Sequence, residues 1–216
     1  MPYGKLALDT IETSGNLAIT GNTSISGDLA TGNLAITGNV TVNNNLTVNG
    51  DVTTSRGTVT SLVSGIAQTA SGTSVTFTGI PSWVKRITVM VNGLSLSGTG
   101  WYGMRLGTSS GIITTGYSST QTRQLGSGTE TSSSSGMFLW HPNLASETNN
   151  GQMIITKLQD GVWIATGQFS TILSTNYIVV TSAGILTGAG TIDRVSVISG
   201  NGTDTFDAGS INIMYE

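Results

Sequence analysis

The sequence predicts an all-β protein, in which an N-terminal β-helical shaft wound from three copies of the chain precedes a C-terminal β-sandwich of the jelly-roll type. Three observations carry this prediction. Residues 15–55 repeat with a six-residue period, and residues 66–216 are short apolar runs separated by turn residues. Charged residues make up only 9% of the chain, against about 25% in a typical globular protein, so the charged surface typical of helices is missing.

The composition excludes several classes of function. The chain has no cysteine and one histidine, His141, so we expect no disulfide, no metal site and no cofactor. A net charge of −3 argues against nucleic acid as a partner, because such binding needs clustered Lys and Arg. No segment approaches the roughly 20 apolar residues of a membrane-spanning helix, so we expect no membrane insertion.

The repeats keep their large apolar residues on one face. Each hexad starts with Gly or Asn and continues as apolar–small–apolar–polar, and GNLAIT occurs at 15–20 and again at 32–37. The large apolar residues are odd-numbered before the five-residue repeat at 27–31 and even-numbered after it. Because strand side chains alternate between faces and a one-residue slip swaps the faces, we expect a bulge near Gly32. The residues are Leu17, Ile19, Ile25, Leu29, Leu34, Ile36, Val40, Val42, Leu46, Val48 and Val52.

Three other arrangements fit this parity, the odd or even numbering of the large apolar residues, less well. A hairpin turn at Gly21-Asn22 would pair Ile19 with Ser24 and scramble the apolar face, because paired residues share a face. A single-chain left-handed β-helix would have little more than two coils with open ends. A flexible linker has no reason to keep the parity. Three chains around one axis would bury the eleven residues as a trimer core and close every strand edge.

The rest of the chain is predicted from turn signals and apolar runs. The organisation is a head at residues 1–14, the shaft at 15–55, a join at 56–65 and a β-sandwich knob at 66–216. The polar stretch 118–136 is interpreted as a surface loop or a binding loop. Strands are expected near 74–80, 84–92, 101–107, 111–117, 137–141, 152–158, 162–170, 176–183, 192–199 and 209–215.

Several segments resemble virion proteins. The hexad array leading into a compact β domain resembles the trimeric fibres of tailed bacteriophages, and PYGKLALDTIETSGNLAITGN looks like the attachment peptides of phage structural proteins. FTGIPSWVKRITVMVNGLSLSGT at 77–99, GIITTGYSS at 111–119 and FDAGSINIMYE at 206–216 are similar to C-terminal domains of virion proteins from cyanobacterial and marine phages. Such proteins are tail fibres, head fibres or capsid decoration proteins.

The resemblance implies a homotrimeric structural protein on the surface of a phage particle, with the knob outward. It implies that residues 1–14 dock onto a capsid or tail protein, for example by strand addition to an exposed sheet edge. The docking residues would be Tyr3, Lys5, Leu6, Leu8 and Ile11. The alternative is a receptor-binding fibre whose knob recognises a glycan of the host surface.

Aromatic residues supply the candidates for glycan binding, because aromatic rings stack on sugars. Trp101, Tyr102 and Tyr117 are the candidates, and Trp163 is expected in the core. Adjacent strand residues point to opposite faces, so at most one of Trp101 and Tyr102 belongs to the core.

The carboxylates do not predict an enzyme. A glycosidase needs two carboxylates about 5–10 Å apart, and we interpret Glu130, Glu147, Asp160 and Asp193 as turn and surface residues. The segment NGTDTFD at 201–207 contains oxygen ligands that calcium could use. We interpret it instead as a polar turn before the last strand.

Overall fold

The computed structural model describes residues 40–43, 47–49, 52–54, 57–59, 62–123, 129–140, 142, 144–145, 147–173 and 176–216. The chain divides into two compact units, Met1–Asn49 and Gly50–Glu216, and all described strands belong to the second. These residues form antiparallel sheets and no helix, which confirms the all-β class. No helix in the described ranges could therefore cross a membrane.

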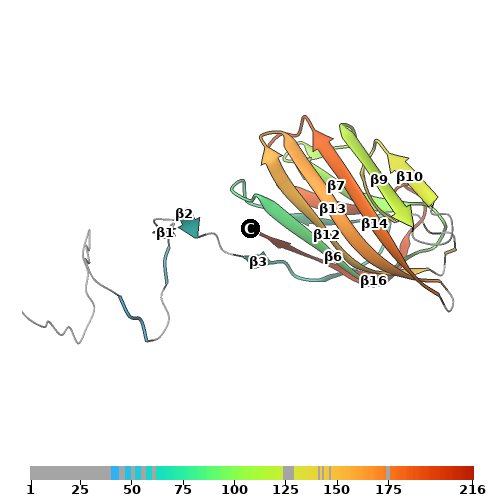
Figure 1. Ribbon diagram of the computed structural model, residues 1–216, viewed down its shortest axis with the longest axis horizontal. Helices are drawn as coiled ribbons and strands as arrows, with labels where there is room; N and C mark the ends of the chain where they lie inside the picture. Colours follow the sequence, from blue (N-terminus) through green and yellow to red (C-terminus); the bar gives the residue numbers. More distant parts are fainter. Residues whose placement is uncertain are drawn as a thin grey trace, which may run out of the picture. The chain divides into compact units, whose positions relative to one another are not determined.

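The larger sheet of the second unit has the strand order β10-β9-β14-β13-β12-β6-β16-β3, and β4 also pairs with β16 (Figure 1). Its strands are β3 (Val63–Ser64), β4 (Gln68–Thr69), β6 (Arg86–Leu96), β9 (Tyr117–Arg123), β10 (Thr129–Ser133), β12 (Thr148–Gln159), β13 (Val162–Leu173), β14 (Asn176–Thr187) and β16 (Phe206–Tyr215).

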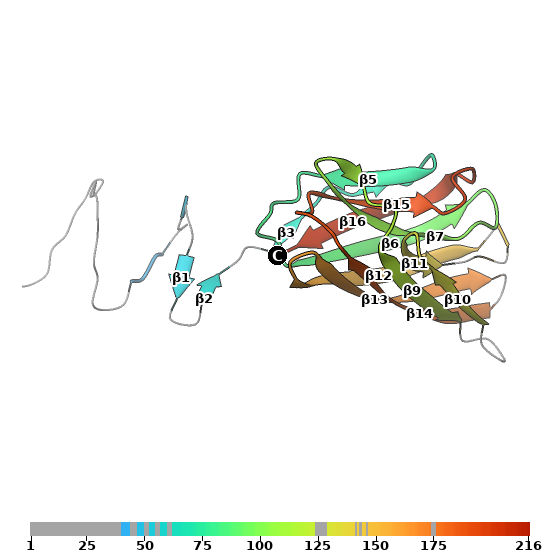
Figure 2. The same cartoon turned by 90° about the horizontal axis from the view of Figure 1, so that it is seen from above.

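The smaller sheet has the order β11-β7-β15-β5, with β8 added beside β7. Figure 2 shows β5 and β15 in one layer and β13 and β14 in the other, so the two sheets form a sandwich. The strands of the smaller sheet are β5 (Ser74–Thr78), β7 (Tyr102–Thr108), β8 (Gly111–Ile112), β11 (Met137–Trp140) and β15 (Arg194–Ser199).

The core lies between the two sheets and follows from side-chain alternation. In β6, Val89 is fully buried, and its neighbour Met153 in β12 is also fully buried. The smaller sheet contributes Met104 and Val197, which are paired across β7 and β15. In the middle of β6 and of β12, buried apolar residues alternate with more exposed ones, which is the pattern of a sheet with one buried face, whereas β7 and β15 are buried on most of both faces.

The polar stretch 118–136, interpreted above as a loop, contains two strands, so that interpretation is wrong. Strand β9 pairs with both β14 and β10. The inward side chains of β9 are polar, since Ser119, Gln121 and Arg123 are 6%, 3% and 5% exposed. In β9, buried and more exposed residues therefore alternate, but apolar and polar residues do not. Residues 124–128 lie outside the described part of the chain.

The expected strand at 111–117 is also wrong. Strand β8 ends at Ile112, and Tyr117 begins β9. Gly116 lies between them with a φ of +85°, a conformation that favours glycine.

The join predicted at residues 56–65 extends into the sandwich, because Val63 pairs with Tyr215 of the last strand.

A short hairpin precedes the sandwich in sequence. Strand β1 (Val52–Thr54) pairs antiparallel with β2 (Gly57–Val59) of the same chain. Hairpin pairing was disfavoured for the hexads because it would mix apolar and polar residues on one face. Here that argument fails, because Val52 lies opposite Val59 and the two apolar residues share a face.

The alternation of β12 gives a matched test of the core. Ile155 is fully buried and Ile154 is partly exposed on the opposite face of the strand. Ile155→Ala should lower the free energy of unfolding by about 2–5 kcal/mol, because it leaves a cavity between the sheets. Ile154→Ala should cost about 1 kcal/mol or less. Urea denaturation of the two variants measures the difference, and equal losses would show that the assigned faces are wrong.

Candidate functional site

The outer face of the larger sheet presents a row of uncharged polar side chains. Gln152 of β12 lies opposite Gln168 of β13, which lies opposite Thr181 of β14. In the next row, Ile154 lies opposite Thr166. Directly opposite residues share a face, so the strand register that packs the core also brings these side chains together outside it.

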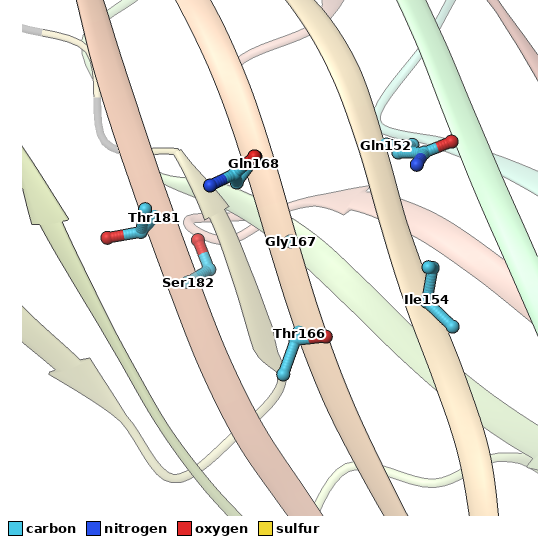
Figure 3. A pocket seen from close by; sticks show the side chains of 7 residues that line it. All are labelled: Gln152, Ile154, Thr166, Gly167, Gln168, Thr181 and Ser182. Atoms are coloured by element: carbon cyan, nitrogen blue, oxygen red, sulfur yellow. The ribbon is translucent and has the colours of Figure 1, made fainter.

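These side chains line a groove of ≈ 360 Å³ (Figure 3). Its lining is Gln152, Ile154, Thr166, Gly167, Gln168, Thr181 and Ser182. The lining contains no charged residue. Glutamine amides and hydroxyl groups both donate and accept hydrogen bonds, so the groove suits an uncharged ligand that carries many hydroxyl groups.

The two glutamines are free to serve such a ligand. Gln152 and Gln168 are exposed, and within the described ranges neither amide has a hydrogen bond to the protein. Figure 3 shows Gln168 beside Thr181 and Ser182 of β14, and Gln152 on the other neighbouring strand, β12. Sequence reasoning missed this site because it depends on the register of three strands. The segment GQMIITKLQ predicted a strand, but not which residues would lie beside Gln152.

Two of the three aromatic candidates for glycan binding are buried, so that interpretation is wrong for them. Tyr102 is 1% exposed, and its ring lies 6.1 Å from the ring of Phe206. Tyr117 is 5% exposed, and its hydroxyl oxygen accepts a hydrogen bond from the Leu106 amide at 2.8 Å. A ring enclosed in the core has no face to offer to a sugar.

Trp101 is half-buried, so the prediction that at most one of Trp101 and Tyr102 belongs to the core is confirmed. Its ring lies 4.9 Å from that of Phe138. A Cβ atom on Gly200 would clash with the Trp101 ring, so this glycine allows the indole to pack on the backbone. These contacts give Trp101 a structural role, and its binding of glycan stays a prediction.

The candidate carboxylates have partners in the protein. Glu147 is buried, so its interpretation as a surface residue is wrong; it accepts hydrogen bonds from Trp140 Nε1 at 3.1 Å and from the Leu144 amide at 3.2 Å. Asp160 pairs with Lys157, and Asp193 pairs with Arg194. In both pairs, the hydrogen bond from the cation lowers the pKa of the aspartate. The side chain of Glu130 and residue His141 lie outside the described residues.

In the segment at 201–207, oxygens of Asn201 and Asp204 accept hydrogen bonds from the protein. Asn201 Oδ1 accepts hydrogen bonds from Ser199 Oγ and from the amides of Thr203 and Asp204. Asp204 Oδ2 accepts a hydrogen bond from the Gly100 amide at 2.8 Å. Among the described residues, no group of three His, Cys, Asp or Glu side chains could hold a metal ion. The interpretation of this segment as a polar turn agrees with these contacts.

No family model matches the chain, and no curated protein or solved structure is significantly similar to it.

The buried tyrosines predict a loss of stability at high pH. Burial raises the pKa of Tyr117 to about 12 and that of Tyr102 well above its ordinary value. The folded state then keeps protons that the unfolded state releases above the ordinary tyrosine pKa of about 10. The free energy of unfolding should be unaffected by these groups below about pH 10 and should fall between about pH 10 and 12.

Urea denaturation at a series of pH values measures this effect. Tyr117→Phe should reduce the fall in stability, whereas replacing the exposed Tyr177 by Phe should leave it unchanged. An identical pH dependence in all three proteins would contradict the assigned role of Tyr117.

Proposed function

We propose that the chain is a structural protein of a bacteriophage particle. It forms a short homotrimeric fibre or a capsid or tail decoration, with its N-terminus on the particle and the sandwich outward. The observation that carries this proposal is the single-parity hexad array of residues 15–55, which precedes a separately folded β-sandwich. Repetition with a fixed apolar face is typical of a shaft, and a sandwich at its end presents surface to the surroundings.

The exposure of the described shaft valines supports assembly. Val40, Val42, Val48 and Val52 are 64%, 42%, 46% and 41% exposed in the single chain. Burial of an apolar side chain contributes about 1.5–3 kcal/mol, so a partner that covers this series gains stability at each position. Two further copies of the chain would supply the same series around one axis.

The remaining predicted trimer-core residues lie outside the described residues, as does the expected bulge near Gly32. The predicted docking residues Tyr3, Lys5, Leu6, Leu8 and Ile11 also lie outside them. In the proposal, this head binds a capsid or tail protein, and the three sandwiches of one trimer act together, which raises the avidity of weak contacts.

A second candidate function is recognition of an uncharged glycan on the host surface. The observation that favours it is the groove with Gln152 and Gln168 on the outer face of the larger sheet. The groove replaces Tyr102 and Tyr117 as the proposed place of contact. Its amides and hydroxyl groups match the hydroxyl groups of a neutral sugar.

Substitution of adjacent shaft residues tests the trimer. Ile36→Asp should destabilise the assembly strongly, because it places three unpaired carboxylates around one axis. Ala35→Asp should be far milder, because residue 35 has the opposite parity. Urea-induced dissociation, followed by light scattering, compares the two variants. Equal effects would refute the assignment of the apolar face.

Substitution of the groove tests the second candidate function. On an array of neutral glycans, Gln168→Ala should weaken binding by roughly three- to tenfold, because one net hydrogen bond is lost. Gln159→Ala is the matched control, since Gln159 is exposed on β12 and does not line the groove. If the wild-type protein binds no neutral glycan, this second function is excluded and the structural role remains.

A further inference from the structure

A second groove, of ≈ 280 Å³, lies on the outer face of the smaller sheet. Thr76 of β5 lies opposite Ser196 of β15, which lies opposite Arg105 of β7, and all three residues line the groove. Ser74 and Thr114 add exposed hydroxyl groups to its lining. This groove thus combines several hydroxyl groups with one guanidinium.

Arg105 is held in place by the backbone. Its Nε atom donates a hydrogen bond to the carbonyl oxygen of Ser135 at 2.6 Å. A Cβ atom on Gly136 would lie 3.6 Å from Arg105 Cγ, so the arginine stem runs close beside this glycine. Because Nε is already bound, the orientation of the planar guanidinium is restricted before any ligand arrives.

The charge of Arg105 has no carboxylate partner in the described part of the chain. Arg86 pairs there with Glu216, and Arg194 pairs with Asp193. Arg105 is half-buried and forms no such pair among the described residues, and no Asp or Glu lines its groove. A partly desolvated guanidinium without a counter-charge favours an anion, and its fork matches a carboxylate or a phosphate.

We propose that this groove binds the acidic group of a sugar, either a carboxylate or a phosphate. The Nη atoms of Arg105 hold the acidic group, and the hydroxyl groups of Ser74 and Thr114 contact the hydroxyl groups of the sugar. A polynucleotide phosphate is disfavoured, because binding of that kind needs several cations and this groove has one. The inference rests on glycan recognition as a function of the sandwich, and it places an acidic ligand on the smaller sheet instead of the larger one.

Calorimetric titration of the full chain tests the proposal with three probes: tetragalacturonate, galactose 1-phosphate and neutral maltotetraose. At least one acidic probe should bind at this groove, and the two acidic probes distinguish carboxylate from phosphate. Arg105→Gln should weaken that binding about tenfold or more, because hydrogen bonds to charged groups are the strong ones. Arg105→Lys should bind more tightly than Arg105→Gln but more weakly than the wild-type protein, because an ammonium group cannot form the two parallel hydrogen bonds of a guanidinium.

Two controls separate binding from folding. Arg86→Gln removes a cation from the larger sheet and should leave the affinity for the acidic probe unchanged. Thr114→Val keeps the Arg105–Ser135 hydrogen bond and should still weaken binding a few-fold, with an unchanged melting temperature.

Three results would overturn the proposal: no binding of either acidic probe, equal affinity in Arg105→Gln, or an effect of Arg105→Gln on the oligomeric state alone. The last result would identify Arg105 as a contact between copies of the chain. Failure of the virion proposal can be told apart from failure of this one. In that case the chain would be monomeric, but its binding of the acidic probe would still depend on Arg105.

Discussion

Strands of the larger sheet such as β6 and β12 bury one of their two faces against the smaller sheet, and their other face points outward. That constraint fixes the register of the larger sheet, where Val89 of β6 and Met153 of β12 lie side by side in the core. A one-residue slip would expose both residues, so the register is strongly specified. The same register aligns Gln152 with Gln168 on the outer face. The surface grooves therefore follow from the pattern that builds the core.

Strand β9 meets the same constraint with polar residues. The Ser119 hydroxyl donates a hydrogen bond to the Gly136 carbonyl oxygen at 2.7 Å, which ties β9 to the start of β11. The guanidinium carbon of Arg123 lies 5.5 Å from the centre of the Trp140 ring, a cation–π geometry. The indole nitrogen of Trp140 in turn binds the Glu147 carboxylate. At this end of the sandwich, a hydrogen bond and a cation–π contact join the polar residues of β9 to the buried apolar strand β11.

These differences explain how much could be predicted from the sequence. Strands with apolar, β-branched runs, such as β6 and β12, were located because their buried residues are apolar. Strand β9 was missed because its buried residues are polar, and the buried member of the Trp101–Tyr102 pair could not be chosen because both are aromatic. The grooves could not be predicted at all, since each joins residues from strands whose register is a tertiary property. The Arg105 groove, for example, joins β5, β7 and β15.

The same constraint underlies the proposed shaft, because an apolar face along residues 15–55 needs a partner surface to cover it. Three chains around one axis would cover it. Sedimentation equilibrium of the full wild-type chain at micromolar concentration tests this claim most directly. The account predicts a mass three times that of the 22.2 kDa chain. A stable monomer whose shaft residues are folded would contradict it.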